Sequence, residues 1–112
     1  MYIGEVSKKT GLSVKAIRLY EEKGLIPVPK RLGAYRVYQA SDLDILVLIK
    51  EARAVDITLS QLKDVIVFKE GKVDWQKMDA FLMQHKSRLL KEIKILKEKI
   101  TLIDQCVSQI QS

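Results

Sequence analysis

IGEVSKKTGLSVKAIRLYEEKGLIP occupies residues 3–27, and LGAYRVY follows at residues 32–38. The first stretch predicts two short helices, because Gly11 and Gly24 can each take the left-handed conformation that ends a helix. Between the two helices, the Ser13 hydroxyl is placed to accept a hydrogen bond from the first turn of the second. The second stretch alternates around a glycine and predicts a small β-hairpin. This order of elements is typical of a winged helix-turn-helix.

Two more short helices are expected after the hairpin. The third helix should start at Ser41 and run to about residue 54, with apolar residues at helical spacing. The fourth should start at Thr58 and end near Phe68, before Gly71. Thr58 and Gln61 have the spacing of a capping box, in which each side chain pairs with the backbone N–H of the other. The predicted fold class is therefore mainly α.

A long last helix, from about Asp74 to Gln109, has the most regular pattern. Its apolar residues alternate by four and three positions over about three heptads, which is the seam of a coiled coil. At ~1.5 Å per residue it would be roughly 55 Å long, so a small core cannot cover it and a second helix must pack on it. We expect a homodimer, with a winged helix-turn-helix domain at 1–71 and a coiled-coil dimerisation helix at 72–112. The predicted dimerisation residues are Leu82, Leu89, Ile93, Leu96, Ile100, Ile103, Val107 and Ile110.

The basic charge of the chain is concentrated near its start. The net charge is +6 over 112 residues. Residues 1–40 hold eight Lys and Arg against three Glu, an excess of five, while residues 41–112 hold twelve basic and eleven acidic residues, an excess of one. Such clustering raises association with phosphates, so double-stranded DNA is favoured as the partner over a merely solvated basic surface.

Composition argues against several other classes of protein. No apolar run approaches the ~18–20 residues of a membrane span, and Lys8 and Lys9 interrupt any signal peptide. Cys106 is the single cysteine and cannot form an internal disulfide, which fits a reducing cytoplasm. Cys106 and His85 would stand about 30 Å apart on one helix, so one chain cannot join them at a metal. We predict no metal, no cofactor and no enzyme, and we expect Cys106 to pack beside the seam.

The residues predicted to contact DNA lie on the second helix and the hairpin. Lys15 and Arg18 fall opposite the apolar side of the second helix, so they can face a major groove. Arg36 shares one face of the hairpin with Tyr38 by two-residue alternation, which favours a phosphate clamp. Tyr20 and Tyr38 have packing in the core as an alternative. The full predicted set is Ser13, Lys15, Arg18, Tyr20, Lys30, Arg31, Tyr35, Arg36 and Tyr38.

Residues 2–38 resemble the DNA-binding domain of the MerR family of bacterial transcription regulators. The motifs that carry the resemblance are Ile3-Gly4-Glu5-Val6, Thr10-Gly11-Leu12-Ser13, Ile17-Arg18-Leu19-Tyr20-Glu21, Gly24-Leu25-Ile26 and Tyr35-Arg36-Val37-Tyr38. The resemblance implies a cytoplasmic, nucleoid-associated regulator that binds a pseudo-palindromic promoter site as a homodimer, with its long helices paired antiparallel. Family members bend and untwist a promoter spacer that is too long, which makes RNA polymerase a further expected partner.

Three features depart from the family's pattern. Leu19 stands where many members have a second Tyr, and Asp56 stands where a Gly is usual before the fourth helix. Members usually continue into an effector-binding loop or domain, whereas this sequence stops at Ser112. Two other functions stay open: an excisionase-like architectural DNA-binding protein without an effector, and a coiled-coil adaptor that binds protein. A steep fall of DNA binding with salt would exclude the adaptor.

Overall fold

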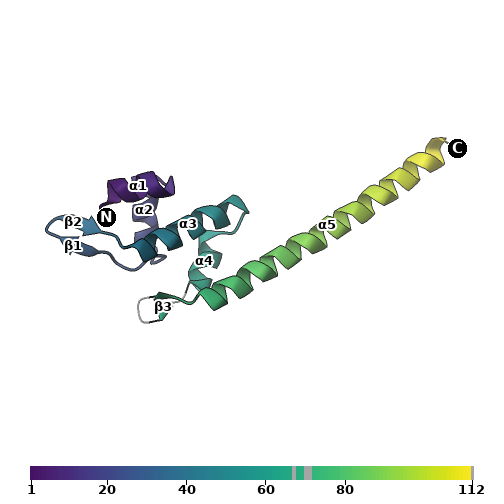
Figure 1. Ribbon diagram of the computed structural model, residues 1–112. Coiled ribbons are helices and arrows are strands. Elements are labelled where there is room, and N and C mark those ends of the chain that lie inside the picture. Colours follow the sequence, from purple (N-terminus) through teal and green to yellow (C-terminus); the bar gives the residue numbers. More distant parts are fainter. Residues whose placement is uncertain (67, 70–71, 112) are drawn as a thin grey trace. The chain divides into compact units, whose positions relative to one another are not determined.

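The computed structural model of the chain describes residues 1–66, 68–69 and 72–111. It divides into two compact units, Met1–Trp75 and Gln76–Ser112. The elements run in the order helix, helix, hairpin, helix, helix, hairpin and long helix (Figure 1). The predicted mainly α fold, with a helix-turn-helix, a small wing and a long last helix, is confirmed.

The helix-turn-helix consists of α1 (Ile3–Thr10) and α2 (Val14–Glu22). Gly11 has a φ of 74° and donates its N–H to the carbonyl four residues earlier at 2.9 Å, which closes α1. The Ser13 hydroxyl accepts a hydrogen bond at 3.0 Å from the N–H three residues later, which opens α2. Gly24 has a φ of 75° just after α2. The glycine and serine signals therefore bound both helices as the sequence predicted.

The start of α3 (Ala40–Ala54) lies one residue before the predicted start at Ser41. The buried Asp42 explains the difference, because its Oδ2 accepts a hydrogen bond at 2.9 Å from the backbone N–H of Gln39. A helix leaves its first N–H groups without partners inside the helix, and this carboxylate satisfies one of them.

The start of α4 (Leu59–Val65) is the predicted capping box. The Thr58 backbone N–H donates to Gln61 Oε1 at 2.9 Å, and the Gln61 backbone N–H donates to the Thr58 hydroxyl at 3.1 Å. Both bonds of the box are present, so this prediction is confirmed.

The predicted end of the fourth helix near Phe68 is wrong. The helix stops before Ile66, whose backbone is extended with φ −69° and ψ 105°. The chain then forms β3 (Phe68–Lys69), which pairs antiparallel with β4 (Lys72–Val73). β-Branched and aromatic residues favour a paired strand at this point over a further helical turn. The predicted boundary at Gly71 lies outside the described residues.

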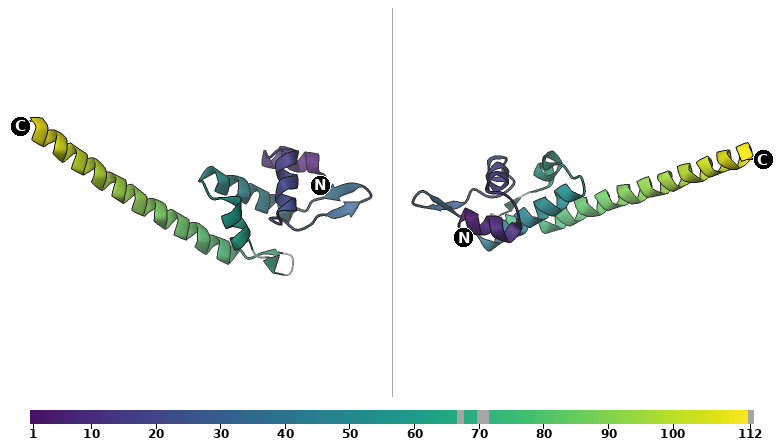
Figure 2. Two further views of the ribbon diagram at one scale, coloured as in Figure 1. Left: turned by 180° about the vertical axis from the view of Figure 1, so that it is seen from behind. Right: turned by 90° about the horizontal axis from the view of Figure 1, so that it is seen from above.

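The core of the Met1–Trp75 unit is shared by its helices and by the chain around the first hairpin. α1 contacts both α2 and α3, and α3 contacts α4 (Figure 2). Burying each large apolar side chain contributes roughly 1.5–3 kcal/mol. α2 is thereby held on a rigid base. The large apolar side chains of this unit that are at most 2% exposed are Val6, Ile17, Leu25, Ile26, Tyr38, Leu46, Ile49, Ile57 and Leu62.

The predicted wing is the antiparallel hairpin of β1 (Lys30–Leu32) and β2 (Tyr35–Val37), which projects from the helices (Figure 1). The start of the chain fixes its base. The Tyr38 backbone N–H donates to the Met1 carbonyl at 2.7 Å, and the Met1 ammonium donates to the Tyr38 carbonyl at 3.0 Å. The wing is therefore tied to the first residues of the chain, next to α1.

The last helix, α5 (Trp75–Gln111), is continuous over 37 residues, close to the predicted Asp74 to Gln109. In the single chain, the predicted seam residues from Leu89 to Ile110 are between 41% and 85% exposed. An aliphatic stripe of this length is unfavourable in water, so it is expected to be covered by a partner.

Candidate nucleic-acid interface

α2 presents a charged side to solvent. Ile17 and Tyr20 are buried and dock the helix on the core, while Lys15 and Arg18 are exposed. The Ser13 hydroxyl at the start of the helix is engaged in the cap. Two cations therefore stand in the N-terminal part of a well-anchored helix, and the Tyr20 ring lies in the core.

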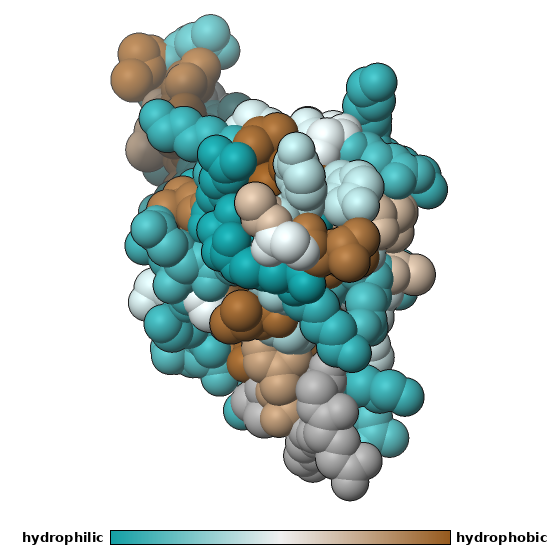
Figure 3. Space-filling model, turned by 90° about the vertical axis from the view of Figure 1, so that its left-hand side faces the viewer, coloured by the Kyte–Doolittle hydropathy of each residue, from teal (hydrophilic) through white to brown (hydrophobic). Residues whose placement is uncertain are grey.

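The wing adds further exposed polar and aromatic residues. Lys30, Arg31 and Tyr35 are exposed on the hairpin, and Arg31 lies directly opposite Arg36. Seen from the hairpin side, the surface is mostly hydrophilic with apolar side chains between (Figure 3). Like charges directly opposite each other destabilise a sheet, so the hairpin benefits from an anion beside these arginines.

Glu21 of α2 supplies one such anion. Arg36 Nε lies 3.0 Å from Glu21 Oε2 and donates a hydrogen bond to Oε1 at 3.1 Å. The Tyr38 hydroxyl donates to Glu21 Oε2 at 3.3 Å. The Arg36 and Glu21 side chains are 29% and 12% exposed, so the ion pair is largely removed from water. Arg36 and Tyr38 reach the same carboxylate, which confirms that they share one face of the hairpin.

The Tyr38 hydroxyl is held in its neutral form. Burial, and after it the Glu21 carboxylate, raises the pKa of Tyr38 to about 12. The hydroxyl therefore stays protonated at neutral pH and continues to donate to Glu21. Tyr38 is 2% exposed as a residue, so it packs in the core while its hydroxyl holds the carboxylate.

Arg18 and Arg36 line the same two hollows, one of about 300 Å³ and one of about 80 Å³. Two arginines from separate elements thus line one surface, and guanidinium suits the bidentate recognition of phosphate. The larger hollow is lined by Lys15, Arg18, Leu19, Glu21, Glu22, Val28 and Arg36. The smaller hollow is lined by Tyr2, Ile3, Arg18, Ala34, Tyr35 and Arg36.

The structure brings together four of the nine predicted contact residues at these hollows: Lys15, Arg18, Tyr35 and Arg36. The lining of the two hollows does not include Lys30 or Arg31, which lie on β1. Contact with DNA stays a prediction for the whole set.

Sequence reasoning missed two residues of this surface. The Tyr2 ring lies with its centre 5.7 Å from that of Tyr35 and lines the smaller hollow. Nothing local indicated this contact, because Tyr2 precedes the first helix. Glu21 was missed as the partner of Arg36, although an acidic residue within a basic stretch is a signal that it is neutralised nearby.

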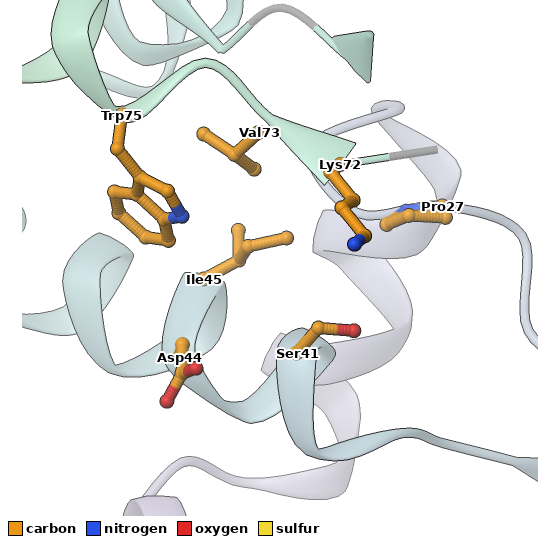
Figure 4. Close-up of a pocket in the computed structure, with 7 residues that line it drawn as sticks. All are labelled: Pro27, Ser41, Asp44, Ile45, Lys72, Val73 and Trp75. Carbon is orange, nitrogen blue, oxygen red and sulfur yellow. The ribbon is translucent and has the colours of Figure 1, made fainter. Parts of the chain in front are cut away.

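A hollow of a different kind, of about 180 Å³, lies against α3 (Figure 4). Ile45, Val73 and Trp75 give it apolar walls. Pro27, Ser41, Asp44 and Lys72 complete the lining.

Across the part of the chain that the structure describes, no group of three or more His, Cys, Asp or Glu is placed to hold a metal. No helix in that part is both long enough and apolar enough to cross a membrane.

Comparison with known proteins gives the family. The sequence model described as "MerR HTH family regulatory protein" matches residues 1–67. The chain belongs to the MerR family. The match spans the helix-turn-helix and the first hairpin, which together carry the surface described above.

Relatives within the MerR family cover different shares of the chain. The HTH-type transcriptional regulator CueR of Yersinia pestis is 45% identical over 67 residues, 59% of this chain and 48% of CueR. Heavy metal-dependent transcription regulator 1 of Rhizobium meliloti (strain 1021) is 31% identical over 111 residues, 96% of this chain and 76% of that protein. The match to CueR thus spans about half the length of that relative.

A solved structure shares the fold. HiNmlR, a MerR family regulator lacking the sensor domain, was crystallised bound to promoter DNA. It matches with a TM-score of 0.62 and 22% identity, over 98% of this chain and 89% of HiNmlR.

Proposed function

We propose that this MerR-family chain binds duplex DNA sequence-specifically and regulates transcription from a promoter. The observation that carries the proposal is the convergence of Arg18, from α2, and Arg36, from the wing, at one basic surface. HiNmlR, which shares the fold, is bound to promoter DNA in its crystal structure, and we propose the same class of ligand here.

The two arginines are given different roles. In helix-turn-helix proteins the second helix lies in the major groove and its N-terminal residues contact base edges. Lys15 and Arg18 stand in that part of α2, so we assign Arg18 to a base edge or an adjacent phosphate. Arg36 lies on a wing, which follows the DNA backbone, so we assign it to a phosphate.

The active form is proposed to be a homodimer. The exposed seam of α5 favours a second copy of the same helix as its cover, since the aliphatic pattern is regular over its length. An antiparallel pair would place one helix-turn-helix at each end, matching a pseudo-palindromic site. RNA polymerase at the same promoter is the further partner proposed.

Replacing the two arginines tests the function. Arg18→Ala and Arg36→Ala should each cost about 1–3 kcal/mol of binding free energy if the lost contact is to a base edge. If the lost contact is to a phosphate, the slope of log binding constant against log salt concentration should fall in magnitude by about one. Arg88→Ala is the matched control, because Arg88 is exposed on α5, belongs to the other compact unit and lines neither of the two hollows. Binding is measured by fluorescence anisotropy over a range of KCl concentrations, with a 30-bp duplex that the wild type selects from a random library.

The controls decide the interpretation. Arg88→Ala should bind the duplex as the wild type does. If the double variant of Arg18 and Arg36 also binds with wild-type affinity, the assignment of this surface to DNA is wrong. Binding that does not weaken with salt would favour the adaptor function.

A further inference from the structure

An acidic side chain stands within the proposed DNA-binding surface. Glu21 lines the larger hollow beside Lys15, Arg18 and Arg36. A carboxylate near a phosphate backbone repels it, and a surface that binds DNA through released counterions loses affinity for each uncompensated negative charge. The presence of the Glu21 carboxylate in this basic surface therefore requires a physical explanation.

We propose that Glu21 is a positioning residue for DNA binding, which fixes the Arg36 guanidinium so that its free N–H groups meet the DNA backbone. The inference rests on the proposed function and assigns to the ion pair a role beyond the stability of the fold. Its basis is the geometry of the contact between Glu21 on α2 and Arg36 on β2, which are 15 positions apart in the chain.

The contact uses one particular edge of the guanidinium. Arg36 donates to Glu21 through Nε, at 3.1 Å from Oε1 and with Oε2 at 3.0 Å. An arginine carries five N–H donors, so this contact leaves the four on the two Nη atoms for an anion. The Arg36 side chain is 29% exposed, so part of it is open to solvent, and the proposal places the Nη atoms in that part.

The carboxylate is itself held in place. The Tyr38 hydroxyl donates to Glu21 Oε2 at 3.3 Å from a ring that is 2% exposed and cannot move freely. The chain Tyr38–Glu21–Arg36 thus links a core residue to a surface cation. A long side chain ordered before binding loses less conformational entropy on contact with DNA, so the ordering favours affinity.

The neighbouring glutamate provides a matched control. Glu22 lines the same hollow and is exposed. Within the described residues, the Glu22 side chain makes no hydrogen bond or ion pair, in contrast to that of Glu21. Glu22→Gln therefore removes a negative charge from the proposed DNA-binding surface and breaks no ion pair. Glu21→Gln removes the same charge and also breaks the ion pair that orders the Arg36 side chain.

Four variants separate these effects: Glu21→Gln, Glu22→Gln, Arg36→Ala and the double variant Glu21→Gln/Arg36→Ala. Affinity for the selected 30-bp duplex is measured by anisotropy against KCl concentration, and folding is measured by urea unfolding. Glu22→Gln should bind up to about threefold more tightly, because a screened repulsion is removed. Glu21→Gln should bind about three- to tenfold more weakly although it also removes a negative charge, as expected for the loss of one charge-assisted contact. In the Arg36→Ala background, Glu21→Gln should cause no further loss.

Several results would overturn the inference. If Glu21→Gln tightens binding as Glu22→Gln does, Glu21 is an ordinary repulsive charge. If Glu21→Gln weakens binding equally with and without Arg36, Glu21 acts through the fold as a whole. If Glu21→Gln is unfolded, Arg36→Lys replaces it, since lysine keeps the charge but lacks the Nε edge that Glu21 holds. Wild-type affinity of Arg36→Lys would then contradict the inference. A wild type that binds no duplex defeats the proposed function itself, and this inference with it.

Discussion

At the scale of single residues, Asp56 occupies a position that its side chain disfavours. Its φ is 65°, and among the described residues no other non-glycine residue has a positive φ. The left-handed conformation costs an L-residue roughly 1–2 kcal/mol, somewhat less for Asp, and glycine avoids that cost. A glycine at this position, which the resemblance to the MerR family leads us to expect, would take the same conformation without that cost.

We predict that Asp56→Gly raises the free energy of unfolding by about 0.5–1 kcal/mol, because the relief at positive φ exceeds the extra entropy of the unfolded glycine. Asp56→Ala serves as the control and should be less stable than the wild type, since alanine tolerates this conformation less well than Asp. Urea unfolding of the three proteins measures the differences. A glycine variant no more stable than the alanine variant would show that backbone strain at this position is negligible.

The raised pKa of Tyr38 predicts how stability depends on alkaline pH. Its folded pKa of about 12 lies above the ordinary value of 10.0. The associated stability is therefore fully present below pH 10 and is lost as pH rises toward 12, since burial, and after it the Glu21 carboxylate, disfavours the ionised phenolate. The loss amounts to at most about 2–3 kcal/mol for a shift of this size.

Tyr38→Phe provides the comparison. The advantage of the wild type over Tyr38→Phe in the free energy of unfolding should be constant from pH 7 to 9 and should shrink above pH 10. Urea unfolding at pH 7, 9, 10 and 11 measures this advantage. An advantage that grows with pH would contradict the direction of the shift.

At the scale of elements, local signals in the sequence predicted most of the fold. Gly11, Ser13 and Gly24 act on residues within four positions of themselves, so the helix-turn-helix could be placed from the sequence alone. The end of α4 could not, because β3 forms only through its pairing with β4. Strand pairing depends on a partner segment, which a helical pattern does not reveal.

For the candidate site too, local features could be predicted from the sequence, whereas contacts between elements could not. A helical wheel was sufficient to place Lys15 and Arg18 on the open side of α2. It could not show that Glu21 contacts Arg36 and Tyr38, which are 15 and 17 residues away and lie on β2 and directly after it. That contact depends on how the wing packs on the helix.

The prediction about assembly is that the apolar seam of α5 holds the homodimer together. The double variant Leu96→Glu/Ile103→Glu should be monomeric, because pairing the helices would bury carboxylates at a cost of several kcal/mol. Thr101→Glu/Ser108→Glu adds the same charge to the outer side of the same helix and should remain dimeric. Sedimentation at micromolar concentration distinguishes the two states. A monomeric wild type would contradict the proposed homodimer.

At the scale of the whole molecule, the proposed dimer constrains the DNA it binds. In an antiparallel pair of α5 helices, the two α2 helices would be far apart and related by a twofold axis. Each would enter a major groove of a pseudo-palindromic site with half-sites about two turns apart, at ~10–10.5 bp per turn. If the two recognition helices cannot both fit the grooves of straight B-DNA, the centre of the site should bend, and this is the result that we expect. Bending a 20–30 bp site costs roughly 1–6 kcal/mol, which additional phosphate contacts such as the one proposed for Arg36 can offset.

Promoter spacing tests this mechanism. If the protein activates by shortening the effective distance between the −35 and −10 elements, a promoter whose spacer is one or two base pairs shorter should be transcribed with little dependence on the protein. Transcription in vitro with RNA polymerase, with and without the protein, measures that dependence on both promoters. Because the shorter spacer already presents the two elements in register, bending it further gains nothing and the protein should leave its output unchanged or lower it. A bending assay on the same fragments provides the second readout. A site that stays straight, in a promoter of ordinary spacing, would instead mean that the bound dimer acts by blocking access to the promoter.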